Sequence, residues 1–316
     1  MQRCVMMKLK RYIRSGIRFL SDKDYRTLFL ASRGKYDSMP DREFLQMIYK
    51  ARMGKELNLE NPKTYNEKLN WLKLYDRNPE YTRLVDKFAV KQYVAERIGE
   101  EYVIPLIGGP WYCFDEIDFD ILPHQFVLKT SHDCGGVCIC KDKNEFDAEE
   151  ARRFLTKHLK QNYYLQWREW PYKNVRPCIF AEMYMSDMKG TGQLTDYKFF
   201  CFDGQVKAMF VATDRSSKTE ETKFDFFDEN FHHLPFTQGH PNATKKIECP
   251  PTFDKMKELA SELSKGFPQL RVDFYNVEDR IYFGELTFFH FSGLTQFVPE
   301  QWDRKFGEWI SLPEKK

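Results

Sequence analysis

The residues best suited to chemistry are concentrated in one segment near the C-terminus, LRVDFYNVEDRIYFGELTFF. Side chains alternate along a strand, so Arg271 and Asp273 would share one strand face. For the same reason Glu285 and Thr287 would share a face of the next strand. Mg²⁺ is usually bound by one or two protein carboxylates together with phosphate oxygens of a substrate. The segment therefore predicts a hairpin that carries a candidate magnesium site beside an arginine.

The turn of this hairpin decides whether Asp273 and Glu285 meet. A two-residue turn at Glu278-Asp279 would place the two carboxylates on opposite faces. A three-residue loop that also includes Arg280 would place them directly across from each other. Two anions side by side in an apolar sheet are costly unless a cation joins them. The alternative without a metal is a pair of solvated strand carboxylates, because half of a sheet face can be wet.

A second segment, LKTSHDCGGVCICKDK, combines a strand-end lysine with a polar turn that contains two glycines. Lys129 ends an apolar run. The residues after it that could donate to a phosphate, or let the backbone approach one, are Ser131, His132, Gly135 and Gly136. This pattern predicts a flap over phosphates, although a lysine at a strand end is also commonly a solvated edge residue.

The cysteines of the same segment do not favour a zinc site. Cys138 and Cys140 would share a strand face, but a tetrahedral site usually takes close pairs from turns and needs two further ligands. Only Cys134 and His132 are nearby in the sequence. Eight cysteines in 316 residues are also too few for a disulfide scaffold, so we expect reduced thiols.

The net charge of +2 hides an asymmetry along the chain. Residues 1–35 carry ten Lys and Arg against two Asp, a net charge of +8, which leaves −6 for the remainder. Apolar residues recur in this basic segment at helical spacing, at Leu9, Ile13, Ile17 and Leu20. The predicted amphipathic helix could pack against its own domain or lie on an anionic membrane face. Nucleic acid is not an expected partner, because the rest of the chain is acidic.

No apolar run reaches the roughly 18 residues that a membrane span needs, and no secretory cleavage site follows an apolar segment. The expected compartment is therefore the cytoplasm, with peripheral contact at the inner face of the plasma membrane as the possibility raised by the basic helix.

Helices are expected over most of the first hundred residues. One is predicted from Ser38 and Pro40 to Gly54, and a second begins with a capping box of Thr64 and Glu67. A third is predicted over 82–99, ending at a glycine.

After residue 102 the pattern changes to strands, with a hairpin turned by Asp203-Gly204 and the long hairpin described above. Further helices are predicted at 148–159, 252–265 and 299–310. Hairpins dominate and βαβ units are missing, so the fold class is α+β. The expected organisation is a helical N-terminal region at 1–80, a lid subdomain at 81–180 and a core subdomain at 181–316.

Five segments in order resemble the consecutive motifs of an ATP-grasp domain, and in particular the TupA-like branch associated with teichuronopeptide and other surface-polysaccharide synthesis. They are DKFAVKQYV, FVLKTSHDCGG, CIFAEMYM, DYKFFCFDGQ and RVDFYNVEDRIYFGELTFFHFSG. The resemblance covers about residues 58–312. It implies an ATP-grasp fold in which two α+β subdomains with antiparallel sheets enclose ATP after the helical region.

The resemblance also implies roles around the nucleotide. Lys87 and Lys129 would reach the ATP phosphates, and the turn with Gly135 and Gly136 would cover them, together with Ser131 and His132. Glu182 would be the carboxylate of the nucleotide pocket that meets adenine or ribose. 

At the metal site, the resemblance implies that Asp273, Glu285 and Thr287 hold Mg²⁺, although the wider superfamily commonly has Asn where Thr287 stands. Lys198 would be a further phosphate or transition-state cation, and Arg271 would stabilise charge on the transferred phosphoryl group. Asp133 departs from a glycine-rich phosphate loop, because its charge could repel phosphate or help to hold a cation.

The function implied is an ATP-dependent ligase that joins a carboxylate to an amine through an acylphosphate. The expected partners are ATP, a glycan or uronic-acid acceptor and an amino-acid-like substrate. One alternative is a nucleotide-sugar glycosyltransferase, supported by the triplet Asp118-Phe119-Asp120, which could hold a metal and a diphosphate. Another is a binding module that has kept the fold without turnover.

Overall fold

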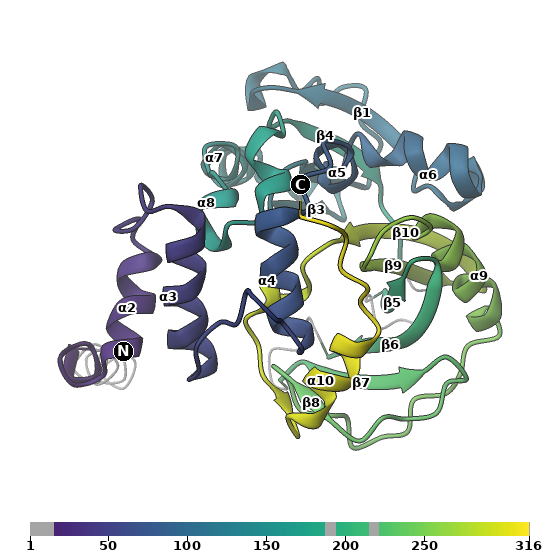
Figure 1. Cartoon of the computed structure of the whole chain (residues 1–316). Coiled ribbons are helices and arrows are strands. Elements are labelled where there is room, and N and C mark those ends of the chain that lie inside the picture. The colour runs from purple at the N-terminus through teal and green to yellow at the C-terminus, as the bar shows by residue number, and fades with distance from the viewer. Residues whose placement is uncertain (1–15, 187–193, 215–220, 316) are drawn as a thin grey trace.

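The strands form two main antiparallel sheets, and the structure, a computed structural model, describes residues 16–186, 194–214 and 221–315. The small sheet has the order β1-β4-β2-β3 and the large sheet the order β10-β9-β5-β6-β7, while β8 pairs with β11. In Figure 1 the small sheet lies above the large one. The strands are β1 (Leu106–Trp111), β2 (Phe126–Thr130), β3 (Val137–Cys140), β4 (Ile179–Met183), β5 (Thr195–Phe202), β6 (Gln205–Thr213), β7 (Lys223–Asp228), β8 (Thr237–Gln238), β9 (Leu270–Val277), β10 (Arg280–Thr287) and β11 (Phe297–Val298).

Helices precede, connect and follow these sheets, so the predicted α+β class is confirmed. The α-helices are α2 (Lys23–Ala31), α3 (Asp41–Met53), α4 (Tyr65–Tyr75), α5 (Glu80–Val85), α6 (Val90–Ile98), α7 (Ala148–Leu159), α8 (Tyr164–Trp167), α9 (Phe253–Leu263) and α10 (Gln301–Glu308). A 3₁₀ segment, η5 (His290–Gly293), follows β10. In the part of the chain that is described, no helix is both long and apolar enough to cross a membrane.

The helix α4 joins the N-terminal region to the large sheet. It begins with the predicted capping box, in which Thr64 and Glu67 each bond the other's backbone N–H. The ring of Tyr65 then packs edge-on against Phe200 of β5 and Phe306 of α10, with centroids 6.2 and 5.7 Å apart. These residues belong to one hydrophobic cluster. The helical region and the large sheet therefore share a core.

The small sheet has a core of its own. Phe126, Leu128 and Ala181, from β2 and β4, pack with Leu155 of α7. Because side chains alternate, Lys129 and Glu182 lie on the opposite face of the sheet, which α7 does not cover. The sheet includes β4, which ends at Met183, three residues beyond the boundary expected at 180. The strand β1 begins at Leu106, later than expected.

The helix predicted over 82–99 is wrong, because it is broken into α5 and α6. The carboxylate of Asp86 accepts hydrogen bonds from the backbone N–H groups of Phe88 and Ala89, at 2.9 and 3.1 Å. Aspartate side chains commonly compete in this way with continued helix. The backbone N–H of Lys87, in the break, donates instead to Ser131 O at 2.9 Å. The break therefore brings Lys87 against the loop that follows β2.

The β9–β10 hairpin combines parts of both alternatives considered from the sequence. Its turn is the two-residue one, and Glu278 and Asp279 both have positive φ, at 52° and 60°. A bulge at Gly284 then shifts the register by one residue, so Glu285 still pairs with Asp273. A Cβ at Gly284 would lie 3.1 Å from the carbonyl oxygen of Asp273, which is unusually close. The glycine thus permits the register that brings the two carboxylates together.

The other hairpin prediction is confirmed. Asp203-Gly204 forms the two-residue turn between β5 and β6, with φ of 46° and 77°. The predicted α7, α9 and α10 are also present.

Candidate active site

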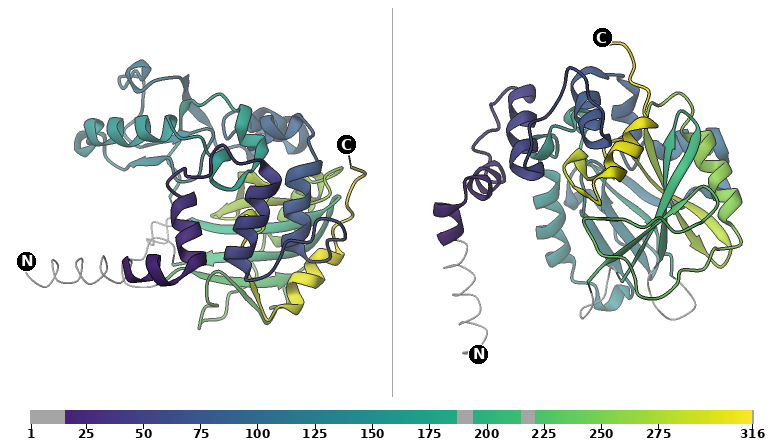
Figure 2. Two further views of the ribbon diagram at one scale, coloured as in Figure 1. Left: turned by 60° about the vertical axis from the view of Figure 1, so that its left-hand side comes forward. Right: turned by 60° about the horizontal axis from the view of Figure 1, so that its bottom comes forward.

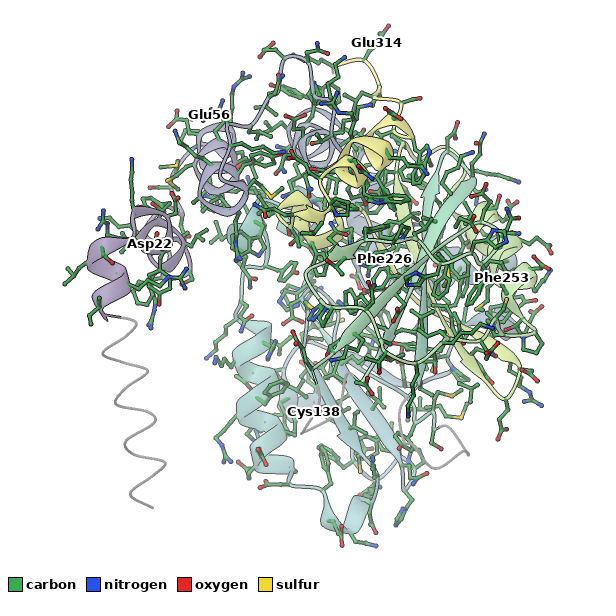
Figure 3. All side chains as sticks on the ribbon, turned by 90° about the horizontal axis from the view of Figure 1, so that it is seen from below. Asp22, Glu56, Cys138, Phe226, Phe253 and Glu314 are labelled. Atoms are coloured by element: carbon green, nitrogen blue, oxygen red, sulfur yellow. The ribbon has the colours of Figure 1, made fainter. Side chains whose placement is uncertain are left out.

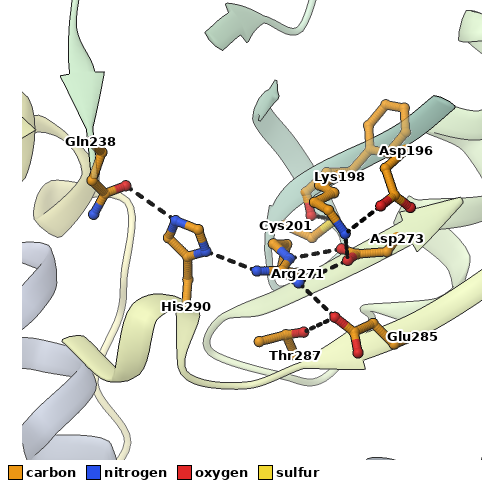
Figure 4. Close-up of polar contacts among 10 residues, drawn as sticks. Asp196, Lys198, Cys201, Gln238, Arg271, Asp273, Glu285, Thr287 and His290 are labelled. Carbon is orange, nitrogen blue, oxygen red and sulfur yellow. Dashed lines mark hydrogen bonds and ion pairs between the residues drawn. The ribbon is translucent and has the colours of Figure 1, made fainter. Parts of the chain in front are cut away.

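Three adjacent strands of the large sheet bring five of the predicted site residues together. In the register of the sheet, Lys198 of β5 pairs with Asp273 of β9, which pairs in turn with Glu285 of β10. Arg271 pairs with Thr287. Figure 4 shows these side chains in one cluster. Residues nearly ninety positions apart in the sequence are therefore neighbours because of strand order.

Arg271 links the two carboxylates of this cluster. Its Nε and Nη2 donate to the two oxygens of Asp273, both at 2.7 Å, and Nη2 also donates to Glu285 at 2.9 Å. Lys198 forms a second ion pair with Asp273, and Asp196 lies 3.5 Å from the same ammonium. Burial alone would lower the pKa of Arg271, but the Asp273 and Glu285 carboxylates raise it. The arginine is thus a fixed cation between two anions.

Glu285 is the accessible carboxylate of the cluster. Its side chain is 40% exposed, whereas that of Asp273 is 1% exposed. Partial desolvation of the carboxylate would raise the pKa of Glu285, but the positive charges of Lys198, Arg271 and Lys87 lower it to about 2. Thr287 donates a long hydrogen bond of 3.4 Å to the same carboxylate. Glu285 is therefore ionised at neutral pH and open to a ligand.

His290 and Gln238 support Arg271 from behind, and the sequence did not reveal either residue. Arg271 Nη1 donates to Nδ1 of His290 at 2.8 Å, and the other ring nitrogen lies 3.1 Å from Oε1 of Gln238. Arginine can only donate, so the hydrogen of the neutral ring is on Nε2 and points to Gln238. Burial and the neighbouring Arg271 and Lys198 hold the pKa of His290 well below its usual value. The neutral imidazole fixes one end of the guanidinium.

A polar stripe on α4 holds the loop that carries His290. Asn66, Asn70 and Lys73, at positions i, i+4 and i+7, are fully buried. They donate to the carbonyl oxygens of Thr295, Gly293 and Ser292 at 3.0, 2.8 and 2.7 Å, respectively.

Backbone strain in this loop explains why such support is needed. Phe291 and Ser292 both have left-handed backbone angles, with φ of 47° and 55°, which are costly for residues other than glycine. The α4 donors keep that conformation in place.

The face of the small sheet opposite α7 carries a second charged cluster. Glu182 of β4 forms ion pairs with Lys129 of β2 at 2.5 Å and with Lys91 of α6 at 2.6 Å. Burial would raise the pKa of Glu182, but Lys129 and Lys91 lower it. Lys91 was missed from the sequence, although it lies in the DKFAVKQYV segment. Glu182 in this structure therefore anchors two lysines.

The loop after β2 turns its acidic side chain inward. Asp133 is 1% exposed and bonds Thr130 and His158, so its charge does not face outward. A Cβ at Gly136 would lie 1.7 Å from the hydroxyl of Thr130, so only glycine fits there. Gly135, with φ of 92°, has open space beside it.

Ser131 and His132, both expected at the phosphates, also lie inside the loop. The hydroxyl of Ser131 accepts a hydrogen bond from the backbone N–H of Cys178 at 3.2 Å. Nε2 of His132 lies 3.1 Å from the carbonyl oxygen of Gln161. Both side chains are buried, which leaves Cys134 and Gly135 as the exposed residues at the tip of the loop.

Lys87 connects the two clusters. Its ammonium donates to the backbone carbonyl of Asp133, and its charge helps to lower the pKa of Glu285. The Lys87 ammonium thus lies against the loop after β2 and is close enough to Glu285 for the two charges to interact.

The donor set of the large-sheet cluster fits Mg²⁺ by its chemistry. Asp273, Glu285 and Thr287 offer only oxygen atoms, which this cation prefers. Asp273 is already held by Arg271 and Lys198, so Glu285 is the first available ligand. No group of three or more His, Cys, Asp or Glu residues within the described ranges could hold a metal ion alone. A cation here would therefore also need Thr287 and substrate oxygens.

The triplet considered for a glycosyltransferase is a turn of the small-sheet subdomain. Asp118 accepts a hydrogen bond from the backbone N–H of Asp120 at 2.9 Å, and both are exposed. Phe119 between them packs against Phe126 in the small-sheet core. The structural role of the triplet in this turn thus accounts for its residues without a metal or a diphosphate.

A small antiparallel sheet with a glycine-containing loop, placed over a larger antiparallel sheet with paired carboxylates, is the arrangement expected of the ATP-grasp class. The family model described as TupA-like ATPgrasp matches residues 67–311. The chain therefore belongs to the TupA-like ATP-grasp family, as the sequence motifs indicated. A comparison with curated protein sequences finds no match.

The solved structures similar to this chain include ligases and a synthetase at low sequence identity. D-alanine-D-alanine ligase from Helicobacter pylori is 12% identical with a TM-score of 0.38, over 71% of this chain and 59% of that one. The Bacillus anthracis enzyme of that name, complexed with ATP, is 15% identical with a TM-score of 0.40, over 72% and 63%. N5-carboxyaminoimidazole synthetase from Staphylococcus aureus, complexed with ADP, is 15% identical with a TM-score of 0.40, over 73% and 53%. The chain thus spans about half to two thirds of these enzymes.

Proposed function

We propose that this protein is an ATP-dependent carboxylate-amine ligase that acts through an acylphosphate. The observation that carries the proposal is the pairing of Glu285 with Asp273 beside two fixed cations, Arg271 and Lys198, near a glycine-containing loop. Phosphoryl transfer needs positioning and charge stabilisation more than a covalent protein nucleophile. A site built from fixed charges is suited to that requirement.

The proposed reaction has two steps. A substrate carboxylate oxygen attacks the γ-phosphorus of ATP, the bond to the β,γ-bridging oxygen breaks, and ADP leaves. The amine of the second substrate then attacks the acyl carbon, inorganic phosphate leaves, and the nitrogen loses a proton to form the amide. Each step moves negative charge between oxygens, which nearby cations stabilise.

The proposed roles at the phosphates follow from the charges on each sheet. Lys129 and Lys87 would bind phosphate oxygens from the small-sheet side. Gly135 and Gly136 would let the loop backbone approach the nucleotide. Lys198 and Arg271 would stabilise the transferred phosphoryl group from the large sheet.

We do not propose direct phosphate contacts for Ser131 and His132, because both side chains are turned inward. Their contribution would be to hold the loop in shape. Glu182 would position Lys129, in addition to the predicted contact with adenine or ribose. Mg²⁺, held by Asp273, Glu285 and Thr287 together with substrate oxygens, would supply charge neutralisation between the β- and γ-phosphates.

The proposed substrates come from the TupA-like resemblance. The acceptor would be a glycan or uronic acid of a surface polysaccharide, such as a capsule or teichuronopeptide-like precursor, and the other substrate an amino acid or similar amine. The proposal places the reaction in the cytoplasm, at the inner face of the plasma membrane. The strongly basic first 35 residues support that location.

ADP formation tests the ligase proposal. The protein is incubated with ATP, Mg²⁺, candidate amino acids and uronic-acid glycans, and ADP is measured for each pair of substrates. We expect one pair to raise ADP release and to yield an amide detectable by mass spectrometry. ADP release with a glycosidic product in place of an amide would contradict the proposal.

A thermal-shift comparison separates the ligase from the glycosyltransferase alternative. ATP with Mg²⁺ should stabilise the protein, and a panel of UDP- and GDP-sugars should not, because bound ligands stabilise the folded state by mass action. Stabilisation by the nucleotide sugars alone would overturn the ligase proposal. Stabilisation by ATP with no turnover of any substrate pair would favour the binding-module alternative.

A further inference from the structure

The N-terminal arm, residues 16–35, lies at the periphery of the molecule. It consists of a helical segment at 16–21, the helix α2 and the turn that follows. None of the residues of α2 is fully buried. Figures 1 and 2 show α2 beyond α3, at the outer edge, and Figure 3 shows Asp22 of the arm well apart from Phe226 in the body. Leu28 and Ala31 of α2 pack against the core, while the exposed side chains of the arm are free to contact another surface.

The arm exposes apolar side chains on one face. Ile17 is 62% exposed and Leu20 is 78% exposed, and Leu20 is the most exposed large hydrophobic residue in the described part of the chain. Residues three apart on a helix lie on the same face. Ile17 and Leu20 therefore do not pack against the protein's own domain.

Aromatic rings and arginines give the arm its shape. Phe19 and Phe29 meet edge-on at 5.4 Å, which joins the first helical segment to α2. The guanidinium of Arg18 lies 4.8 Å from the ring of Tyr25, and that of Arg33 lies 5.3 Å from Phe29. Arginines and aromatic rings of this kind suit a boundary between water and an apolar phase, because each has one apolar and one polar part.

Positive charge is concentrated on the same arm. Residues 16–35 carry five Lys and Arg against two Asp, and residues 1–15 add five more basic residues with no acidic one. The rest of the chain has a net charge of −6. An anionic surface would therefore attract the arm and repel much of the body.

We propose that this arm docks the protein on an anionic lipid bilayer, with Ile17 and Leu20 inserted at the headgroup boundary. A nucleic acid would use the charge but would leave these apolar side chains in water, so a lipid surface fits both properties. Each Lys or Arg near an anionic membrane strengthens partition about fivefold. The surface is separate from the active-site residues, so its failure and the failure of the ligase proposal are distinguishable.

Co-sedimentation of the full chain with vesicles tests the docking. We expect binding to vesicles of phosphatidylglycerol and phosphatidylcholine, little binding to pure phosphatidylcholine, and weaker binding as salt screens the charges. Equal binding to both vesicle types, or none to the anionic ones, would overturn the proposal. The proposal would also be overturned if single-stranded DNA displaced the wild type and an Ile17→Asp variant from the vesicles equally well.

Matched variants test the face of the arm. Ile17→Asp should weaken vesicle binding about tenfold, because a charge replaces an inserted apolar group. Ile121, which is also 62% exposed but lies in the small-sheet subdomain, provides the control Ile121→Asp, expected to bind within about twofold of wild type. Circular dichroism and the ATP thermal shift should be unchanged in both. Equal loss in the two variants, or loss in neither, would contradict docking through this face.

Charge variants test whether position matters beyond net charge. Lys23→Glu with Lys35→Glu should weaken binding at least tenfold, whereas Lys245→Glu with Lys246→Glu, the same change of net charge at other exposed lysines, should have a small effect. The same loss in both pairs would show that only net charge matters and would overturn the assignment to the arm.

Discussion

The two sheets carry opposite surpluses of charge where they meet at the site. On the large sheet, Asp196, Asp273 and Glu285 outnumber Lys198 and Arg271. At the small sheet, Lys129 of β2 and Lys91 of α6 outnumber Glu182 of β4, and Lys87 beside the loop adds a further positive charge. The first surplus suits a divalent cation and the second suits phosphate. The difference indicates that the small sheet would hold the phosphates of a nucleotide and the large sheet its metal ion. The contribution of each sheet can be tested separately.

The largest expected effect is on the large-sheet side. Glu285→Gln should lower ADP formation about 100-fold or more, because it removes the accessible anion without changing the shape of the site. The fold should be intact, since this side chain is partly exposed. Glu278→Gln, in the exposed turn of the same hairpin, is the matched control. Unchanged turnover in Glu285→Gln would remove this residue from the mechanism.

The small-sheet side should act mainly on nucleotide binding. Lys129→Gln should raise the Kd for ATP about 10- to 100-fold, because charge-assisted hydrogen bonds to phosphate are lost. Isothermal titration measures this change. Lys141→Gln, at an exposed position after β3, should bind ATP as wild type does. A Kd for Lys129→Gln that equals the control would show that the small sheet does not carry the phosphate contacts.

A smaller effect is expected from the support behind Arg271. Gln238→Leu removes the acceptor for His290 and also the donor to the carbonyl oxygen of Thr295. It should lower kcat about tenfold while the KM for ATP stays within about twofold, since the guanidinium shifts and the nucleotide contacts stay. Gln238→Glu keeps an accepting oxygen and should recover part of the loss. A merely structural role would instead lower the melting temperature and leave kcat of the folded fraction unchanged.

The smallest effect concerns stability in acid. The folded-state pKa of Glu285, about 2, lies below its ordinary value of 4.5, so its contribution is present above about pH 4.5 and is lost as pH falls toward 2. Because the side chain is 40% exposed, water screens the interaction and we expect about 1 kcal/mol. Urea unfolding between pH 6 and pH 3 should show a shallower loss of stability in Glu285→Gln than in wild type. Parallel curves would contradict the assigned shift.

Local sequence signals predicted several elements correctly because the interactions involved are local. The capping box of Thr64 and Glu67 and the turn at Asp203-Gly204 depend on residues within a few positions of one another. The prediction over 82–99 failed for the opposite reason. Helical periodicity continues through the segment, but Asp86 bonds its own backbone and Lys87 finds a partner in Ser131 of a distant loop.

The sequence predicted which residues of the large-sheet cluster lie together, and predicted their contacts less well. Lys198, Arg271, Asp273 and Glu285 do meet. His290 and Gln238 were missed because their partners lie on different elements and no spacing connects them. The only sequence feature that could have indicated His290 is its position as a single histidine among the phenylalanines of the FFHFSG segment.

The sequence alone determined which chemical groups are present, the two hairpins that carry them and the family to which the chain belongs. Only the tertiary structure decided that Glu285 faces Asp273, because the bulge at Gly284 offsets the two-residue turn. It also decided that Asp133 points inward to Thr130 and His158, away from the loop surface. The reason is physical: strand register and side-chain direction depend on hydrogen bonds between segments far apart in the chain, which local patterns do not encode.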